Sequence, residues 1–80
     1  MDEAEQKRYL LQKRHLFELL KDSAIKKRIP FRLTFAAWLE IWGDQIDYRG
    51  SRPGDLYMER IDKAAGYAVG NLRISKREMR

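Results

Sequence analysis

Apolar and charged positions in the first thirty residues follow the repeat of an α-helix. One broad apolar stripe is formed by Tyr9, Leu10, Leu16, Phe17, Leu19, Leu20 and Ala24. No Gly or Pro precedes Pro30, and the stretch is rich in strong helix formers. We therefore predict a long amphipathic helix over residues 3–27, ended by Pro30, because a proline pushes the residue before it out of the helical region.

A second, shorter apolar pattern follows the proline. Its spacing of i, i+3, i+4 and i+7 is carried by Phe35, Trp38, Leu39 and Trp42. Thr34 is a good N-cap, and Gly43 is a good terminator. The pattern predicts a helix over residues 35–42 whose aromatic face belongs to the core.

The remaining chain has the pattern of a small β-unit. Residues 44–55 contain turn residues and predict a loop. Residues 56–61 predict a short strand, residues 63–66 a turn, and residues 67–74 a loop and a second short strand. Ser75 and Glu78 have the spacing of a capping box, which predicts the start of a final helix. The expected fold class is α+β.

Length and composition limit the choice of function. Eighty residues are enough for one domain only, here divided into an N-terminal helix, 1–30, and a second region, 31–80. The absence of Cys excludes disulfides and thiolate chemistry, and the single His15 excludes a site with two imidazoles. No apolar run has the length of a membrane span, so we expect a soluble, cytoplasmic protein without a membrane partner.

The charge of +5 is unevenly distributed. Residues 1–30 carry a net +3, residues 31–48 a net −2 and residues 49–80 a net +4. Two basic ends around an acidic, aromatic middle make nucleic acid the first partner to consider. The basic run at residues 26–28 has two explanations, because cations at a helix C-terminus also complement the helix dipole.

An ordered set of short motifs in the second region resembles the HNH, or ββα-metal, nuclease family, in particular its short phage-type members. The motifs are Leu-Tyr-Met-Glu-Arg-Ile-Asp at 56–62, Gly-Tyr at 66–67 and Gly-Asn-Leu-Arg-Ile at 70–74. An aromatic helix that ends in Trp-Gly, here 38–43, and a Gly- and Arg-rich loop, here 49–54, precede them. The resemblance implies a ββα-metal-like unit on which the two helices pack, and a phage or prophage origin.

The catalytic positions depart from the family pattern. The resemblance places Glu59 at the acidic metal ligand and Arg60 at the catalytic His, where a guanidinium cannot accept a proton. The ligand from the final helix would fall near Arg80 or beyond it. One acidic side chain without a base is a poor hydrolytic site, so we expect no metal and no cofactor. Mg²⁺ or another divalent cation is expected only if the chain is an active nuclease.

Other residues of the motif have expected roles in structure or in binding. The resemblance implies that Asp62, Gly70 and Asn71 support the turn between the strands. The basic residues expected at nucleic acid are Arg49, Arg52, Arg60, Arg73, Lys76 and Arg77. Lys76 and Arg77 are expected at the start of the final helix, where backbone amides also attract phosphate.

Three hypotheses follow. The first is an HNH-like module that has lost its catalytic His and binds double-stranded DNA or a nucleoprotein complex. The second is a protein-interaction factor, an inhibitor or adaptor, that uses helix 3–27 to bind a partner or a second copy. The third is an active metal-dependent DNA endonuclease.

Overall fold

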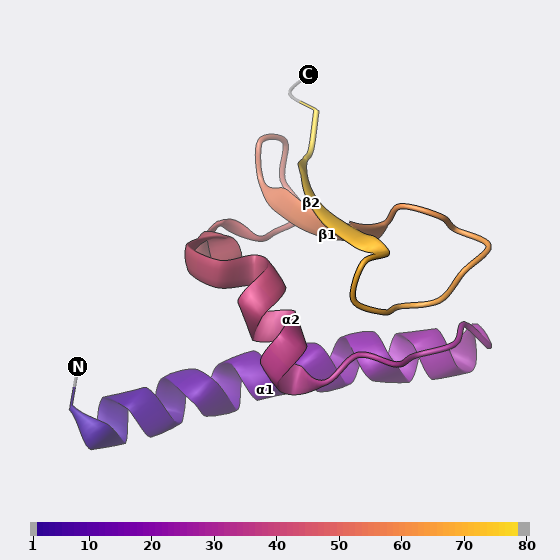
Figure 1. The fold of residues 1–80 in the computed structure, drawn as a ribbon. Coiled ribbons are helices and arrows are strands. Elements are labelled where there is room, and N and C mark those ends of the chain that lie inside the picture. The colour runs from indigo at the N-terminus through magenta and orange to yellow at the C-terminus, as the bar shows by residue number, and fades with distance from the viewer. Residues whose placement is uncertain (1, 79–80) are drawn as a thin grey trace.

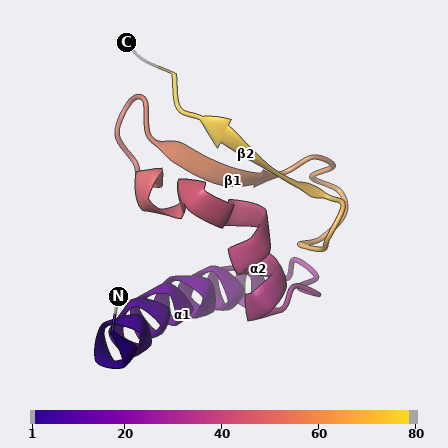
Figure 2. The same cartoon turned by 60° about the vertical axis from the view of Figure 1, so that its left-hand side comes forward.

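The protein is described by a computed structural model that covers residues 2–78. Its elements, in chain order, are α1 (Glu3–Lys26), α2 (Phe35–Trp42), the 3-10 helix η1 (Gly43–Tyr48), β1 (Leu56–Arg60) and β2 (Leu72–Lys76). Figures 1 and 2 show α2 between α1 and the β-hairpin, so the hairpin and the long helix lie on opposite sides of α2. The predicted α+β class is confirmed.

Both ends of α1 are capped. The Asp2 side chain accepts a 2.8 Å hydrogen bond from the Glu5 amide at the N-terminus. At the C-terminus, Arg28 takes a left-handed conformation with φ of 58°. The Ile29 amide donates to Ala24 at 2.8 Å, and the Arg28 amide donates to Ile25 at 3.0 Å. These two bonds form a Schellman motif, which ends the helix before Pro30 is reached.

The core is small and lies where α1, α2 and η1 meet. Its buried members are Phe17, Leu33, Trp38, Trp42 and Ile46. The prediction that the aromatic face of residues 35–42 is core is confirmed. The prediction for α1 was too broad, because Leu10 and Leu19 are 38% and 52% exposed. In Figure 1 the N-terminal half of α1 extends beyond the rest of the molecule, whereas Tyr9, Leu16 and Leu20 of the stripe pack against the core.

The hairpin pairs β1 and β2 in antiparallel register, with Met58 opposite Ile74 and Glu59 opposite Arg73. Successive side chains of a strand point to opposite faces. The face that packs on the core carries Leu56, Met58, Leu72 and Ile74. The opposite face therefore carries Tyr57, Glu59, Arg73 and Ser75, and it presents polar groups on the outside of the hairpin.

Two predictions for the C-terminal half were wrong. Gly43–Tyr48 forms η1, although the whole of 44–55 was expected to be loop. Ser75 lies within β2 and does not begin a helix, because it pairs with Tyr57 and its hydroxyl donates to Glu59 at 2.9 Å. The pairing extends to Arg77, whose amide donates to Asp55 at 2.8 Å. The chain therefore forms a two-stranded antiparallel hairpin, and no third element follows it up to residue 78.

No helix within residues 2–78 is both long enough and apolar enough to cross a membrane.

Candidate nucleic-acid interface on the hairpin

The connection between the strands is held by one asparagine side chain. Asn71 Oδ1 accepts from the Asp62 amide at 2.9 Å. Asn71 Nδ2 donates to the carbonyl oxygens of Asp62 at 3.1 Å and Gly66 at 2.8 Å. Asp62 Oδ1 in turn accepts from the Ala64 amide at 2.9 Å. Gly70, with φ of 91°, gives the chain the positive φ needed to bring Asn71 into this position.

Arg60, which the resemblance places at the catalytic His, is directed into the same turn. Its Nη1 donates to the carbonyl oxygens of Lys63 at 2.7 Å and Ala65 at 3.0 Å. Its guanidinium also lies 5.4 Å from the centre of the Tyr67 ring. Two donors are thus committed to backbone oxygens, and Arg60 is a stabiliser of the turn. Since neighbouring strand residues face opposite ways, Arg60 and Glu59 do not form one site.

Glu59, which the resemblance places at the acidic metal ligand, is hydrogen-bonded on the outer face. Its Oε1 accepts from Arg73 Nε and from Ser75 Oγ. The hydrogen bond from Arg73, followed by that from Ser75, lowers the pKa of the Glu59 carboxyl. Hydrogen bonding to Glu59 raises the pKa of the Tyr57 hydroxyl above its usual 10.0. The Glu59 carboxylate therefore serves as an anchor for its neighbours on the sheet.

The described residues do not assemble a metal site. Within residues 2–78 no three His, Asp or Glu side chains lie close enough together to hold an ion. The single His15 is exposed on α1 and is not on the hairpin. Arg80, near which the resemblance places the remaining ligand, lies outside the described residues. The arrangement on residues 2–78 has neither a base nor a second carboxylate beside Glu59.

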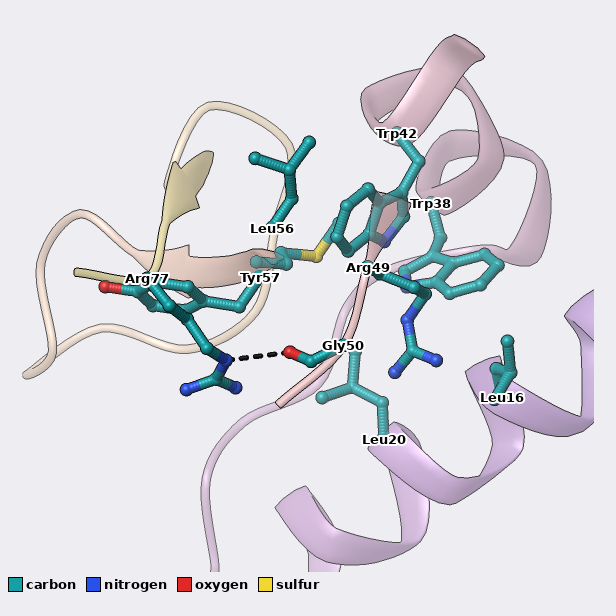
Figure 3. Close-up of a pocket in the computed structure, with 10 residues that line it drawn as sticks. Leu16, Leu20, Trp38, Trp42, Arg49, Gly50, Leu56, Tyr57 and Arg77 are labelled. Carbon is teal, nitrogen blue, oxygen red and sulfur yellow. Dashed lines mark hydrogen bonds between the residues drawn. The ribbon is translucent and has the colours of Figure 1, made fainter. Parts of the chain in front are cut away.

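The six basic residues expected at nucleic acid, taken together with Lys63, fall into three groups. The hairpin cations Arg52, Lys63, Arg73 and Lys76 are exposed. Arg60 is bound in the turn. Arg49 and Arg77 line a pocket beside α1 and α2 (Figure 3).

Arg52 and Lys76 lie at the same end of the hairpin. The Gly54 amide donates to the Arg77 carbonyl at 3.0 Å, which ties the 49–55 loop to the end of β2. Lys63 lies in the turn at the opposite end, and Arg73 lies between the two ends on the outer face. The structure therefore spreads the hairpin cations over the length of the hairpin.

Two features of this region were not predicted from the sequence. Arg60 stabilises the turn because the carbonyl groups of Lys63 and Ala65 point toward its guanidinium. The orientation of these carbonyl groups cannot be predicted from the local sequence pattern. The pocket beside Trp42 arises where three separate elements meet, whereas periodicity describes one element at a time. The only sequence feature that could have indicated this pocket was the number of aromatic and basic residues on either side of Gly43 and Gly50.

Comparisons of this chain with protein-family models, with curated proteins and with solved structures give no match. Function is therefore inferred from the residues and their arrangement.

Proposed function

We propose that this protein binds double-stranded nucleic acid through the hairpin, as an HNH-like module without hydrolytic activity. The observation that carries the proposal is an excess of unpaired positive charge. Residues 49–78 contain seven Lys and Arg against four Asp and Glu. Within these residues one ion pair is formed, between Glu59 and Arg73. Such a surface attracts a polyanion.

Three acidic residues of the hairpin half, Asp55, Glu59 and Asp62, are already engaged with the protein itself. Asp55 accepts from the Arg52 amide at 3.0 Å, and Asp62 accepts from the Ala64 amide. Their carboxylates are thus held toward backbone amides, while the Arg52 and Lys63 side chains are exposed. This arrangement leaves the cations available for phosphates.

The position of β2 supports the same proposal. In the two-stranded sheet β2 is an edge strand, and it carries Arg73 and Lys76. Cations on an edge strand also prevent pairing with another chain, so their presence has a second explanation. The two explanations differ in a measurable way, since only phosphate binding makes affinity for nucleic acid depend on these particular side chains.

Salt dependence tests the proposal directly. Each neutralised phosphate releases counterions and contributes about −0.9 to the slope of log affinity against log salt for duplex DNA. The three hairpin cations without an ion pair, Arg52, Lys63 and Lys76, predict a slope of about −3. The double variant Arg52→Gln/Lys76→Gln should make the slope shallower by about 2 and weaken all sequences alike. Fluorescence anisotropy with a labelled duplex over a salt series measures both quantities.

The matched control removes two charges from the other basic end. Lys26→Gln/Lys27→Gln changes the net charge by the same amount but lies at the end of α1. A slope changed equally by both double variants would mean that binding follows net charge and not the hairpin. A slope that neither variant changes would overturn the proposal.

A second candidate function, protein interaction through α1, is favoured by one observation. Leu11 is 69% exposed, and with Leu10 and Phe35 it lines a shallow apolar groove flanked by Lys7 and Arg14. This groove lies near the part of α1 that extends beyond the body in Figure 1. A light-scattering mass above that of one chain, lowered to one chain by Leu11→Lys, would favour this candidate over binding through the hairpin.

A further inference from the structure

A pocket of about 210 Å³ lies between the two helices and the hairpin, apart from the hairpin cations. Leu16 and Leu20 of α1 and the two tryptophans of α2 form its apolar walls. Arg49 lies at its margin, with its guanidinium drawn between α1 and α2 (Figure 3). The pocket is thus apolar on two sides and carries a cation on a third.

A buried polar group in this pocket has no partner. Trp42 is 3% exposed, and its Nε1 makes no hydrogen bond to any of residues 2–78. Figure 3 shows the indole nitrogen on the side of the ring that faces Arg49 and the interior of the pocket. Buried donors are nearly always paired, because an unpaired one loses its hydrogen bond to water without replacement. An acceptor brought by a ligand would satisfy it.

Donors predominate among the polar groups that line the pocket, namely Trp42 Nε1 and the guanidinium groups of Arg49 and Arg77. The Gly50 carbonyl already accepts from Arg77, and the Tyr57 hydroxyl is hydrogen-bonded with Glu59. Trp Nε1 and the Arg guanidinium can donate but cannot accept a hydrogen bond. The Arg49 side chain has no carboxylate within ion-pair distance among residues 2–78. Arg77 is held in place by the 2.7 Å bond from its Nε to the Gly50 carbonyl and lies 4.8 Å from the Tyr57 ring centre. The pocket therefore matches a ligand with acceptor atoms and negative charge.

The apolar walls and the volume of the pocket limit the size and chemical class of the ligand further. Benzene fits a dry apolar cavity of about 150 Å³, so about 210 Å³ holds one ring with a small substituent. A guanidinium binds a planar carboxylate through two parallel hydrogen bonds. We propose that this pocket binds a small aromatic monocarboxylate. Its ring packs among Leu16, Leu20 and the tryptophans, and its carboxylate accepts from Trp42 Nε1 and Arg49. This site is independent of the proposed binding of nucleic acid.

Titration of the full chain with phenylacetate tests the proposal. The indole N–H signal of Trp42, assigned by its loss in Trp42→Phe, should shift in a saturable way in NMR spectra. Phenylacetamide has nearly the same shape without the charge and should bind at least tenfold more weakly. Acetate, which has the charge without the ring, should give no saturable shift.

Two arginine variants supply the matched comparison. Arg49→Gln should weaken phenylacetate binding about tenfold to a hundredfold, the usual loss of a charged hydrogen bond. Arg52→Gln removes the same charge from a residue three positions away that does not line the pocket, and it should leave the affinity unchanged. Both positions are exposed, so both variants should fold. The proposal is overturned by an unshifted Trp42 signal, by equal affinity for phenylacetamide, or by equal effects of the two variants.

Discussion

At the scale of single residues, Glu59 links the charge of the hairpin to its stability. Its folded pKa lies below the ordinary value of 4.5 because Arg73 and Ser75 donate to the carboxylate. A depressed folded pKa contributes stability that is present above the unfolded pKa and is lost as pH falls toward the folded pKa. We therefore expect the free energy of unfolding to decrease as the solution is acidified below about 4.5.

Glu59→Gln should remove this contribution at neutral pH and leave the free energy of unfolding at low pH nearly unchanged. The free energy of unfolding should therefore fall less steeply as the pH is lowered than it does in the unchanged protein. Urea unfolding followed by circular dichroism over a pH series measures the difference. Glu40→Gln is the control, because Glu40 is exposed on α2 and forms no ion pair within residues 2–78. If Glu40→Gln reduces the loss of stability at low pH as much as Glu59→Gln does, the ion pair between Glu59 and Arg73 does not cause that loss.

The role of a residue could be anticipated where its bond follows a common turn pattern or where the resemblance implied it, and not where it depends on how carbonyl groups a few positions away are oriented. The role of Asp62 in its turn follows from a side chain that bonds an amide two residues ahead. The support that Asn71 gives to the turn was expected only from the resemblance, because its bonds to Asp62 and Gly66 require the strands to be paired first. Arg60 was expected at a phosphate because its charge is visible in the sequence, whereas the carbonyls that bind it are not.

At the scale of elements, the end of α1 is strained by one side chain. Arg28 adopts a left-handed conformation, which costs a residue with a Cβ about 1–2 kcal/mol relative to glycine. Replacing Arg28 with glycine would relieve this strain, but glycine loses more conformational freedom on folding, which offsets about 0.5–1 kcal/mol of the stability gained. Arg28→Gly should therefore raise the free energy of unfolding by roughly 0.5–1 kcal/mol. Thermal and urea unfolding measure it.

Arg28→Ala separates backbone strain from charge. It removes the same guanidinium but keeps a Cβ at the left-handed position, so it should not stabilise the protein. Equal stabilisation by Arg28→Ala and Arg28→Gly would show that the relevant change is lost repulsion among residues 26–28 and not relief of strain.

The elements that were predicted correctly begin and end at residues whose own capping preferences mark the boundary. Thr34 accepts from the Ala37 amide at 3.1 Å, and Gly43 ends α2 with φ of 54°, as their sequence positions suggest. Ser75 has the spacing of a helix cap, but the same hydroxyl is used by Glu59 across the hairpin. A tertiary hydrogen bond decided between strand and helix there, and local propensity could not report it.

At the scale of the whole molecule, two electrostatic effects act in opposite directions. Residues 2–78 form three ion pairs, Lys13–Asp47, Arg14–Glu18 and Glu59–Arg73. Partly or fully exposed pairs of this kind are worth about 0–1 kcal/mol each. Against them stands the net charge of +5 on a chain with a radius of gyration of 13.4 Å. Two unit charges about 13 Å apart in water repel by about 0.3 kcal/mol, so ten pairs of excess charges cost about 3 kcal/mol.

This comparison predicts that repulsion is the larger effect, so moderate salt should stabilise the fold. Raising sodium chloride from about 0.01 to 0.15 M shortens the Debye length from about 30 to 8 Å and screens charges spread over the surface. We expect the free energy of unfolding to rise by about 1 kcal/mol, or about 4–8 °C in Tm for a domain of this size. Differential scanning calorimetry at fixed pH measures the shift. Arg52→Gln/Lys76→Gln, with two fewer excess charges, should show a smaller rise. A Tm that falls as salt is added would mean that the three ion pairs outweigh the net charge.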